Sequence, residues 1–258
     1  MTEETRVTQD FLDSSQYVES SILHYESIYG EDFVSPGGAG LAFELISEMA
    51  LEPGSRVLDV GCGLGGSAFV MARDFGLRVD GIDLSRNMLK LAERKLQDNG
   101  LSDSVNLSWG DCLELDCREQ YDAVYSRDVF LHIADKARLF AVLERALKPG
   151  GRLLFTDYCC SPPPWNDEFR VYVEERGYIL HTPGEYEGFL RDAGFEAVVA
   201  RDETDRFAEI LQAELERMDG LAIEPAQLEK LRLSWRKKLE RAGAGHQRWG
   251  LFSAFRRA

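Results

Sequence analysis

The chain has 258 residues, of which 44% are hydrophobic and 29% are charged, a composition that predicts a globular protein with a sizeable core. Its formal net charge is −15, so it repels the phosphates of nucleic acids and anionic lipids, and we expect neither as a partner. No apolar run reaches the roughly 18 residues that a membrane-spanning helix needs.

The N-terminal segment, MTEETRVTQDF, is polar and mildly acidic. It lacks the basic start and apolar centre of a secretory signal, so we expect a cytoplasmic protein. The five cysteines show no C-x-x-C spacing, which indicates free thiols. Two helical patterns occupy residues 7–50, joined by VSPGG at 34–38, and we expect them to cover the strand ends as a lid.

Residues 51–160 alternate between buried strand patterns and helical patterns. Strands are expected at 56–63, 78–85, 105–112, 121–128 and 151–158, and helices at 66–74, 86–98 and 135–147. This alternation predicts a mostly parallel, doubly wound sheet, which binds ligands at the carboxyl ends of its strands. The remainder is mostly helical, over 166–178, 183–193 and 204–242, with a candidate closing strand at 248–255. We therefore expect a single domain over 1–258, with a lid at 1–50, a core at 51–160 and a helical cap with closing strands at 161–258.

A glycine-rich turn follows the first expected strand. The segment LDVGCGLGG contains G-x-G-x-x-G at Gly61, Gly63 and Gly66, which permits a tight turn and close approach of a ligand to the backbone. Asp83 ends the next strand, at about the distance where an acid grips a ribose hydroxyl. The same pattern occurs in NAD-binding folds, so a nicotinamide dehydrogenase remains an alternative at this point.

Three features favour S-adenosylmethionine over NAD. Asp59 precedes the glycines, where a carboxylate can face the ammonium end of this cofactor and would repel a pyrophosphate. Asp111, in WGDC, follows the third strand, as expected for an acid that reads the adenine amino group, and KPGG at 148–151 leads into the fifth strand. Together these features resemble the Rossmann-like class I methyltransferase fold, with a mostly parallel seven-stranded sheet. S-Adenosylhomocysteine would be the product.

Five further segments resemble one family, the phosphoethanolamine N-methyltransferases. They are FLDSSQY (11–17), YESIYGEDFVSPGG (25–38), YSRDVFLHI (125–133), TDYC (156–159) and QRWGLF (247–252). The resemblance runs from about residue 11 to 255, is especially close to the second catalytic half of the plant enzymes, and matches the single-domain parasite enzymes in length. It implies methylation of phosphoethanolamine, or of its mono- and dimethyl forms, toward phosphocholine.

The stretch from Tyr125 to Ile133 supplies groups suited to this reaction. An ammonium must lose a proton before its nitrogen can attack a methyl group, and His132 is a base whose ordinary pKa is near neutral. Asp128 can hold the amine, and a helix after Asp128 would put both side chains on one face. The resemblance pairs Tyr17, from the lid, with His132, and its hydroxyl would hydrogen-bond the imidazole.

The resemblance also implies binding residues, position by position. For the phosphobase they are Gln16, Tyr25, Asp128, Tyr158, Arg176, Tyr178 and Lys238. For the cofactor they are Val34, Ser35, Asp59, Gly61, Gly63, Asp83, Leu84, Asp111, Cys112 and Ser126. Arg127 matches a residue beside the site and receives no role. We expect no metal and a monomer.

Two functions other than phosphobase methylation are alternatives for this sequence. The substrate could be a different small amine, such as aminoethylphosphonate or a glycine-type amino acid, but a carboxylate would not need Arg176, Tyr178 and Lys238 to converge. A non-catalytic S-adenosylmethionine-binding regulator would not need Asp128 and His132.

Val129 and Phe130 form a bulkier pair than the family pattern predicts, which could narrow the pocket beside the amine.

Overall fold

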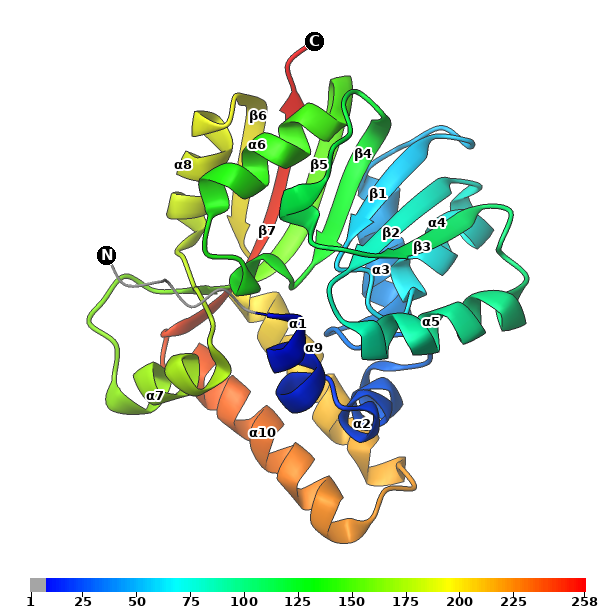
Figure 1. Ribbon diagram of the computed structural model, residues 1–258. Helices are drawn as coiled ribbons and strands as arrows, with labels where there is room; N and C mark the ends of the chain where they lie inside the picture. The colour runs from blue at the N-terminus through cyan, green and yellow to red at the C-terminus, as the bar shows by residue number, and fades with distance from the viewer. Residues whose placement is uncertain (1–7) are drawn as a thin grey trace.

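A single seven-stranded sheet organises the molecule (Figure 1). The computed structural model describes residues 8–258, apart from the side chains of Ser15 and Gln16. The strand order is β3-β2-β1-β4-β5-β7-β6. The strands are β1 (Arg56–Val60), β2 (Arg78–Asp83), β3 (Val105–Trp109), β4 (Tyr121–Arg127), β5 (Leu147–Cys160), β6 (Phe195–Asp202) and β7 (Gln247–Arg256). Only β7 runs antiparallel to its neighbours in this sheet, which confirms the predicted fold class.

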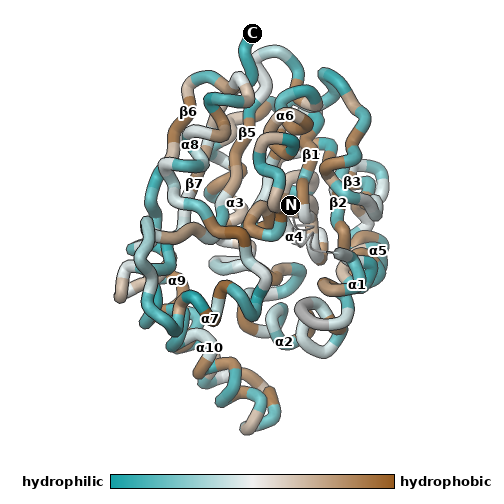
Figure 2. Tube along the Cα trace, turned by 60° about the vertical axis from the view of Figure 1, so that its left-hand side comes forward, coloured by the Kyte–Doolittle hydropathy of each residue, from teal (hydrophilic) through white to brown (hydrophobic). Residues whose placement is uncertain are grey.

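Helices cover both faces of the sheet. On one face lie α3 (Gly38–Glu48), α4 (Gly66–Phe75) and α5 (Arg86–Asn99), and on the other α6 (Lys136–Ala146) and α8 (Pro183–Asp192). Strand residues alternate between the two faces. Val57, Ala123 and Leu154 therefore join one apolar core, and their neighbours along the strands join the other. Figure 2 shows the hydrophobic colour following the strands of the sheet.

A second group of helices lies beneath the carboxyl ends of the parallel strands (Figure 1). It comprises α1 (Gln9–Phe11), η1 (Leu12–Gln16), α2 (Glu19–Tyr29), α7 (Asp167–Arg176), α9 (Thr204–Arg217), η4 (Met218–Gly220) and α10 (Pro225–Gly243). Two short 3₁₀ turns, η2 (Cys112–Glu114) and η3 (Phe130–His132), follow β3 and β4. A ligand at the strand ends would thus be enclosed between the sheet and this layer.

The segment over 204–242 is mostly helical, as predicted, and consists of α9 and α10. The two are separated between Met218 and Glu224, because Pro225 starts a new helix whose first amides bond to the Glu224 carboxylate. Strand β6 had not been assigned. It lies at the edge of the sheet, where alternate residues face solvent, so its apolar run is short.

Candidate active site

A cavity of about 420 Å³ opens at the carboxyl ends of β1, β2 and β4. Its walls bring together residues from the lid, the sheet, α7 and α10. The predicted site residues that line it are Tyr17, Tyr25, Val34, Ser35, Asp59, Gly61, Gly63, Asp83, Leu84, Asp111, Cys112, Asp128, His132, Tyr158, Arg176, Tyr178 and Lys238. Ser126 does not line it, and the side chain of Gln16 lies outside the described part of the chain.

The glycine turn after β1 forms one end of this cavity. Gly61 and Gly63 have φ angles of +71° and +55°, which favour glycine. A Cβ on Gly61 would lie 2.2 Å from Cγ2 of Val129. The Val129 methyl groups therefore pack against the turn itself, while Phe130 is buried in the core. Val129 lines the cavity and Phe130 does not, so only Val129 could narrow the space inside it.

Two carboxylates face this end of the cavity. Asp83 accepts hydrogen bonds from the amides of Gly63 and Ser85, both at 2.8 Å. Asp59 is buried, and its Oδ2 has no hydrogen-bond partner. Burial raises the pKa of Asp59 to about 7, with a further contribution from the Asp83 charge, and burial raises the pKa of Asp83 to about 6.

These features fit the cofactor expected from the sequence. An unpartnered buried carboxylate next to a second acid is stabilised by a cationic ligand, and the sulfonium and ammonium groups of S-adenosylmethionine are cationic. The pyrophosphate of NAD would add negative charge beside Asp59. The open glycine turn also admits a ligand close to the backbone.

Asp128 stands at the end of β4 in a left-handed conformation, with φ at +56°. Its Oδ1 accepts hydrogen bonds from Trp249 Nε1 at 2.8 Å and from Thr156 Oγ1 at 3.1 Å. Its Oδ2 is buried without a partner, and burial raises the pKa of this carboxyl. One oxygen is therefore fixed by the protein, and the other is left to accept a bond within the cavity wall.

His132 lies in the 3₁₀ turn η3, so the expected α-helical face shared by Asp128 and His132 is wrong. The left-handed residue at 128 reverses the chain before the turn, and both side chains still line the cavity. The Lys136 ammonium holds this turn by donating hydrogen bonds to the carbonyls of Phe130 and Ile133. Burial, Lys136 and Arg176 lower the pKa of His132 to about 4, well below the near-neutral value expected from the sequence.

Tyr17 lines the same cavity, but no hydrogen bond joins its hydroxyl to His132. The imidazole instead meets the Tyr178 ring edge-on, with 5.4 Å between ring centroids, and its Nδ1 is buried without a partner. Burial and the negative charge of Asp83 raise the pKa of the Tyr17 hydroxyl. This hydroxyl therefore stays protonated and can donate.

The far end of the cavity combines two cations with tyrosines. Arg176, on α7, lies against Tyr178, Tyr25 and Tyr172; burial opposes its charge, but these tyrosines raise its pKa overall. Lys238, on α10, is buried and donates to the Tyr29 hydroxyl at 3.2 Å. Burial lowers the pKa of Lys238 to about 8, so it keeps its charge at neutral pH.

Lys238 also lies over an aromatic ring that is itself held in place. Its Nζ is 4.1 Å from the Trp235 ring centroid. Trp235 Nε1 donates to Glu214, whose other oxygen accepts from the amide of Gly37 at 2.8 Å. The lid hinge and α10 are thereby connected through one buried carboxylate.

Several structural partners of the site carried no recognisable signal in the sequence. Tyr29, Tyr172 and Lys136 contact the predicted residues from different elements, and spacing along the chain does not bring them together. Arg127, which had no assigned role, donates to the carbonyls of Gly38 and Pro36 and so fixes the lid hinge. The Ser126 hydroxyl donates to the Val60 carbonyl, 2.7 Å away, inside the sheet.

Within residues 8–258, no three or more His, Cys, Asp or Glu side chains are grouped so as to hold a metal ion. In the same residues, no helix combines the length and the apolar character needed to cross a bilayer.

Comparisons with known proteins agree with this geometry. A family model described as a methyltransferase domain matches residues 51–201. Phosphoethanolamine N-methyltransferase 3 of Arabidopsis thaliana is 44% identical over 96% of this chain, which spans about half (52%) of that protein's length. The enzyme of Plasmodium falciparum is 34% identical, with 95% of this chain and 94% of the relative covered.

A solved structure shows the same fold. Phosphoethanolamine N-methyltransferase 2 of Haemonchus contortus, in complex with phosphomonomethylethanolamine and S-adenosylhomocysteine, superposes with a TM-score of 0.93. It is 33% identical, and the alignment covers 97% of this chain and 60% of that one. By these relatives and this fold, the chain belongs to the phosphoethanolamine N-methyltransferase family.

Proposed function

We propose that this chain transfers methyl groups from S-adenosylmethionine to the nitrogen of phosphoethanolamine, or of its mono- and dimethyl forms, toward phosphocholine. One observation carries the proposal. A single cavity joins an end with two carboxylates, Asp59 and Asp83, to an end with two cations, Arg176 and Lys238, and His132 and Asp128 line its wall. The first end suits a cationic cofactor and the second suits a phosphate.

The cofactor, when bound, supplies an electrophilic methyl group on a sulfonium. Asp59 then meets positive charge, and Asp83 can accept from ribose hydroxyls. Val34, Ser35, Leu84, Asp111 and Cys112 complete the wall at this end. Ser126 acts from inside the sheet, by linking β1 to β4.

Charge and hydrogen bonding position the phosphobase at the other end. Arg176 offers a planar fork of donors and Lys238 a point charge, and both are suited to a phosphate dianion. Tyr25 and Tyr178 add hydroxyl groups beside Arg176. The free Oδ2 of Asp128 accepts from the substrate ammonium and stabilises the positive charge that remains on nitrogen after each methyl transfer.

His132 takes the proton that the ammonium must lose. Its pKa, lowered to about 4 in the ligand-free protein, keeps the imidazole neutral at physiological pH but makes it a weak base in that state. A bound phosphate dianion would offset the charge of Arg176, one of the groups that lower this pKa, so substrate binding makes His132 a stronger base. The Tyr17 hydroxyl closes the site from the lid, in the same cavity that His132 lines.

The mono- and dimethyl intermediates are cations when protonated, and the trimethylated product bears a permanent positive charge. The rings of Tyr158 and Tyr178 lie at 6.3 Å, edge to face, in the cavity wall, and aromatic faces of this kind stabilise methylated cations. This favours successive methylation in one site. Another small amine with an acidic group, such as aminoethylphosphonate, remains the alternative substrate, since a phosphonate would use the same two cations.

The test is methyl transfer from labelled S-adenosylmethionine to phosphoethanolamine, its monomethyl form, its dimethyl form and free ethanolamine, measured in parallel. Product on phosphorylated bases alone is the expected result, and the series counts the methylation steps. Product on aminoethylphosphonate alone would transfer the proposal to that substrate. Binding of S-adenosylmethionine without transfer to any of these amines would contradict the proposed substrate class.

Three further expectations accompany the proposal. Transfer should proceed unchanged in the presence of EDTA, because the proposed steps use only protein side chains. The chain should elute from a sizing column at the mass of a monomer. A fluorescent fusion should distribute through the cytoplasm.

A further inference from the structure

The lid segment that carries Tyr17 is bonded to the first turn of helix α5. The carboxylate of Asp13, in η1, accepts a hydrogen bond from the Ser85 hydroxyl. It also accepts from the amides of Arg86 at 3.1 Å and Asn87 at 3.4 Å. These amides begin a helix and have no partner within it, so a carboxylate from elsewhere is well placed to satisfy them.

Asn87 completes the connection in the opposite direction. Its side-chain amide donates to the carbonyl of Asp13 at 3.1 Å and to the carbonyl of Tyr17 at 2.9 Å. One side chain of α5 therefore holds the backbone near the start and at the end of η1, which is a π-helical turn. Tyr17 is the end of that turn, with its own amide bonded to the Leu12 carbonyl at 2.7 Å.

The same turn of α5 is tied to the cofactor end of the cavity. Asp83 accepts from the amide of Ser85, and Ser85 in turn donates to Asp13. Further along α5, the Lys95 ammonium pairs with Glu26 of α2 and with Asp32. Helix α5 and its N-cap thus bond the lid at two places, through Ser85 and through Lys95. Ser85 is two residues from Asp83.

We propose that Asp13 and Asn87 are positioning residues for methyl transfer: by fastening η1 to the start of α5, they hold Tyr17 in the cavity that His132 also lines, and they make lid closure depend on the cofactor bound at Asp83. The inference rests on the proposed function for its effect on catalysis. Its structural part, the fastening of residues 8–18, stands independently. Neither residue lines the cavity, so neither touches the substrate or the cofactor.

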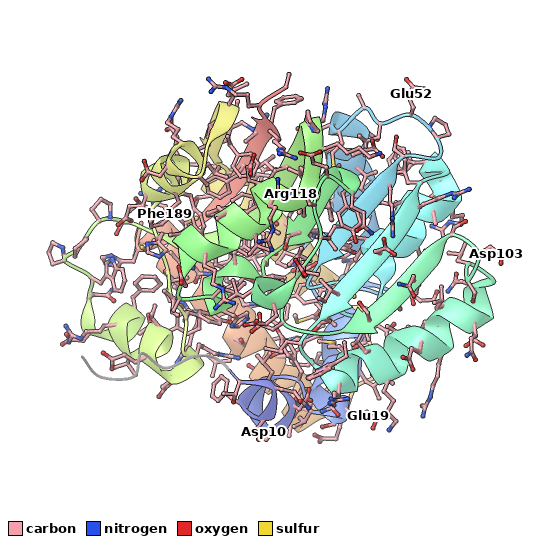
Figure 3. The ribbon with its side chains drawn as sticks, turned by 45° about the horizontal axis from the view of Figure 1, so that its top comes forward. Asp10, Glu19, Glu52, Asp103, Arg118 and Phe189 are labelled. Atoms are coloured by element: carbon pink, nitrogen blue, oxygen red, sulfur yellow. The ribbon has the colours of Figure 1, made fainter. Side chains whose placement is uncertain are left out.

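Hydrogen–deuterium exchange tests the fastening without turnover. The samples are the full chain with saturating S-adenosylhomocysteine, as wild type and as Asp13→Ala and Asn87→Ala. Asp10→Ala is the matched control, because Asp10 lies in the same lid segment but is exposed at the rim of the molecule (Figure 3). Asn99→Ala, at the exposed far end of α5, controls for Asn87.

The expected result is exchange of residues 8–18 that is roughly 10-fold faster in both variants, because Asp13→Ala loses the hydrogen bonds to its carboxylate and Asn87→Ala loses its two bonds to backbone carbonyls. Strands β1 and β4 should exchange as in wild type, and both controls should stay within about twofold of it. Removing S-adenosylhomocysteine from the wild type should also speed exchange of residues 8–18. Equal exchange rates in Asp13→Ala and Asp10→Ala would overturn the proposal. So would an exchange rate of residues 8–18 in the wild type that is the same with and without S-adenosylhomocysteine.

A double-mutant cycle tests the link to Tyr17. Asp13→Ala should lower kcat for the phosphobase by roughly 10-fold in the wild-type background, but by less than about twofold in Tyr17→Phe, because the residue through which it acts is already disabled. Equal losses in both backgrounds would mean that Asp13 does not act through Tyr17. If the wild type methylates no phosphobase, the proposed function fails, and the exchange experiment still decides whether Asp13 and Asn87 fasten the lid.

Discussion

The two ends of the cavity are built in different ways. At the cofactor end, the key groups lie on β1, β2 and the turns that directly follow them, and Asp83 is held by amides only a few residues or one strand away. At the phosphobase end, Tyr17, Asp128, Arg176 and Lys238 come from four elements separated by up to 221 residues of sequence, from 17 to 238. The first end is part of the sheet; the second exists only when the lid, α7 and α10 are packed together.

Because the two ends are built differently, we expect substitutions in them to have different effects. A site on a rigid sheet keeps its geometry with or without ligand, whereas a site assembled from helices depends on their packing. Substitutions at the phosphobase end should therefore act on turnover and on the phosphobase, and substitutions at the cofactor end should act on cofactor affinity and its pH dependence.

The largest effect is expected for His132→Ala. Loss of the base should lower kcat on the order of 10³-fold, within the usual range for general base catalysis. Affinity for S-adenosylhomocysteine, measured by calorimetry, should stay within about twofold, because His132 belongs to the other end. His24→Ala, on α2 and outside the cavity lining, is the control. If His132→Ala lowered cofactor affinity as much as it lowered kcat, the two ends of the cavity would not act separately.

Lys238→Met comes next. Removing this charge while keeping the shape of the side chain should raise KM for the phosphobase by roughly 10- to 100-fold, the value of a hydrogen bond to a charged group. The kcat should change far less. Lys237→Met, the exposed neighbour on the same helix, should behave as wild type. A loss in kcat with unchanged KM would mean that Lys238 acts in the methyl-transfer step and not in phosphate binding.

The next effect is a pH dependence of binding at the cofactor end. Because the pKa is raised to about 7 in Asp59 and to about 6 in Asp83, both are partly protonated in the free protein at neutral pH. Binding requires the ionised forms, since Asp59 would meet the ammonium of S-adenosylhomocysteine and Asp83 would accept from its ribose hydroxyls. Affinity for S-adenosylhomocysteine should therefore rise as the pH increases from 5.5 to about 7.5, by roughly 10-fold, and then level off. Calorimetry in two buffers of different ionisation enthalpy should detect proton release at pH 6.5. Affinity independent of pH would mean that Asp59 does not meet the ammonium and that Asp83 does not accept from the ribose.

The smallest effect is a gain in stability. At pH 8 the buried Asp59 is ionised beside Asp83 at a cost, so Asp59→Asn should raise the Tm of the cofactor-free protein by about 2–4 °C, the shift expected for roughly 1 kcal/mol in a chain of this size. As the pH falls from about 7 toward the unfolded-state pKa of about 3.9, the folded Asp59 is protonated and the gain should shrink, and it should vanish only below about pH 4. The same variant should bind S-adenosylhomocysteine more weakly at pH 8. A Tm that falls both at pH 8 and at about pH 4 would show that Asp59 stabilises the fold instead.

Much of this molecule could be anticipated from its sequence. The alternation of strand and helix patterns predicted the sheet, and the glycine turn with Asp59 and Asp83 predicted its cofactor end, because these groups follow one another closely along the chain. The pKa of His132 could not be anticipated, since it depends on burial and on Lys136 and Arg176, which lie on other elements. The reversal at Asp128 was likewise missed, because a left-handed aspartate has no distinctive neighbour pattern.

By itself the sequence determined the fold class, the cofactor end and the residue types available for the reaction, because hydrophobic periodicity and short turns are encoded locally. The tertiary structure alone decided which of those residues meet. It left Oδ2 of Asp128 free while Trp249 and Thr156 occupy its partner oxygen, placed Lys238 against Tyr29 and Trp235, and fastened Asp13 to the start of α5. Contacts of this kind join segments tens to hundreds of residues apart, and only the packing of complete helices and strands brings them together.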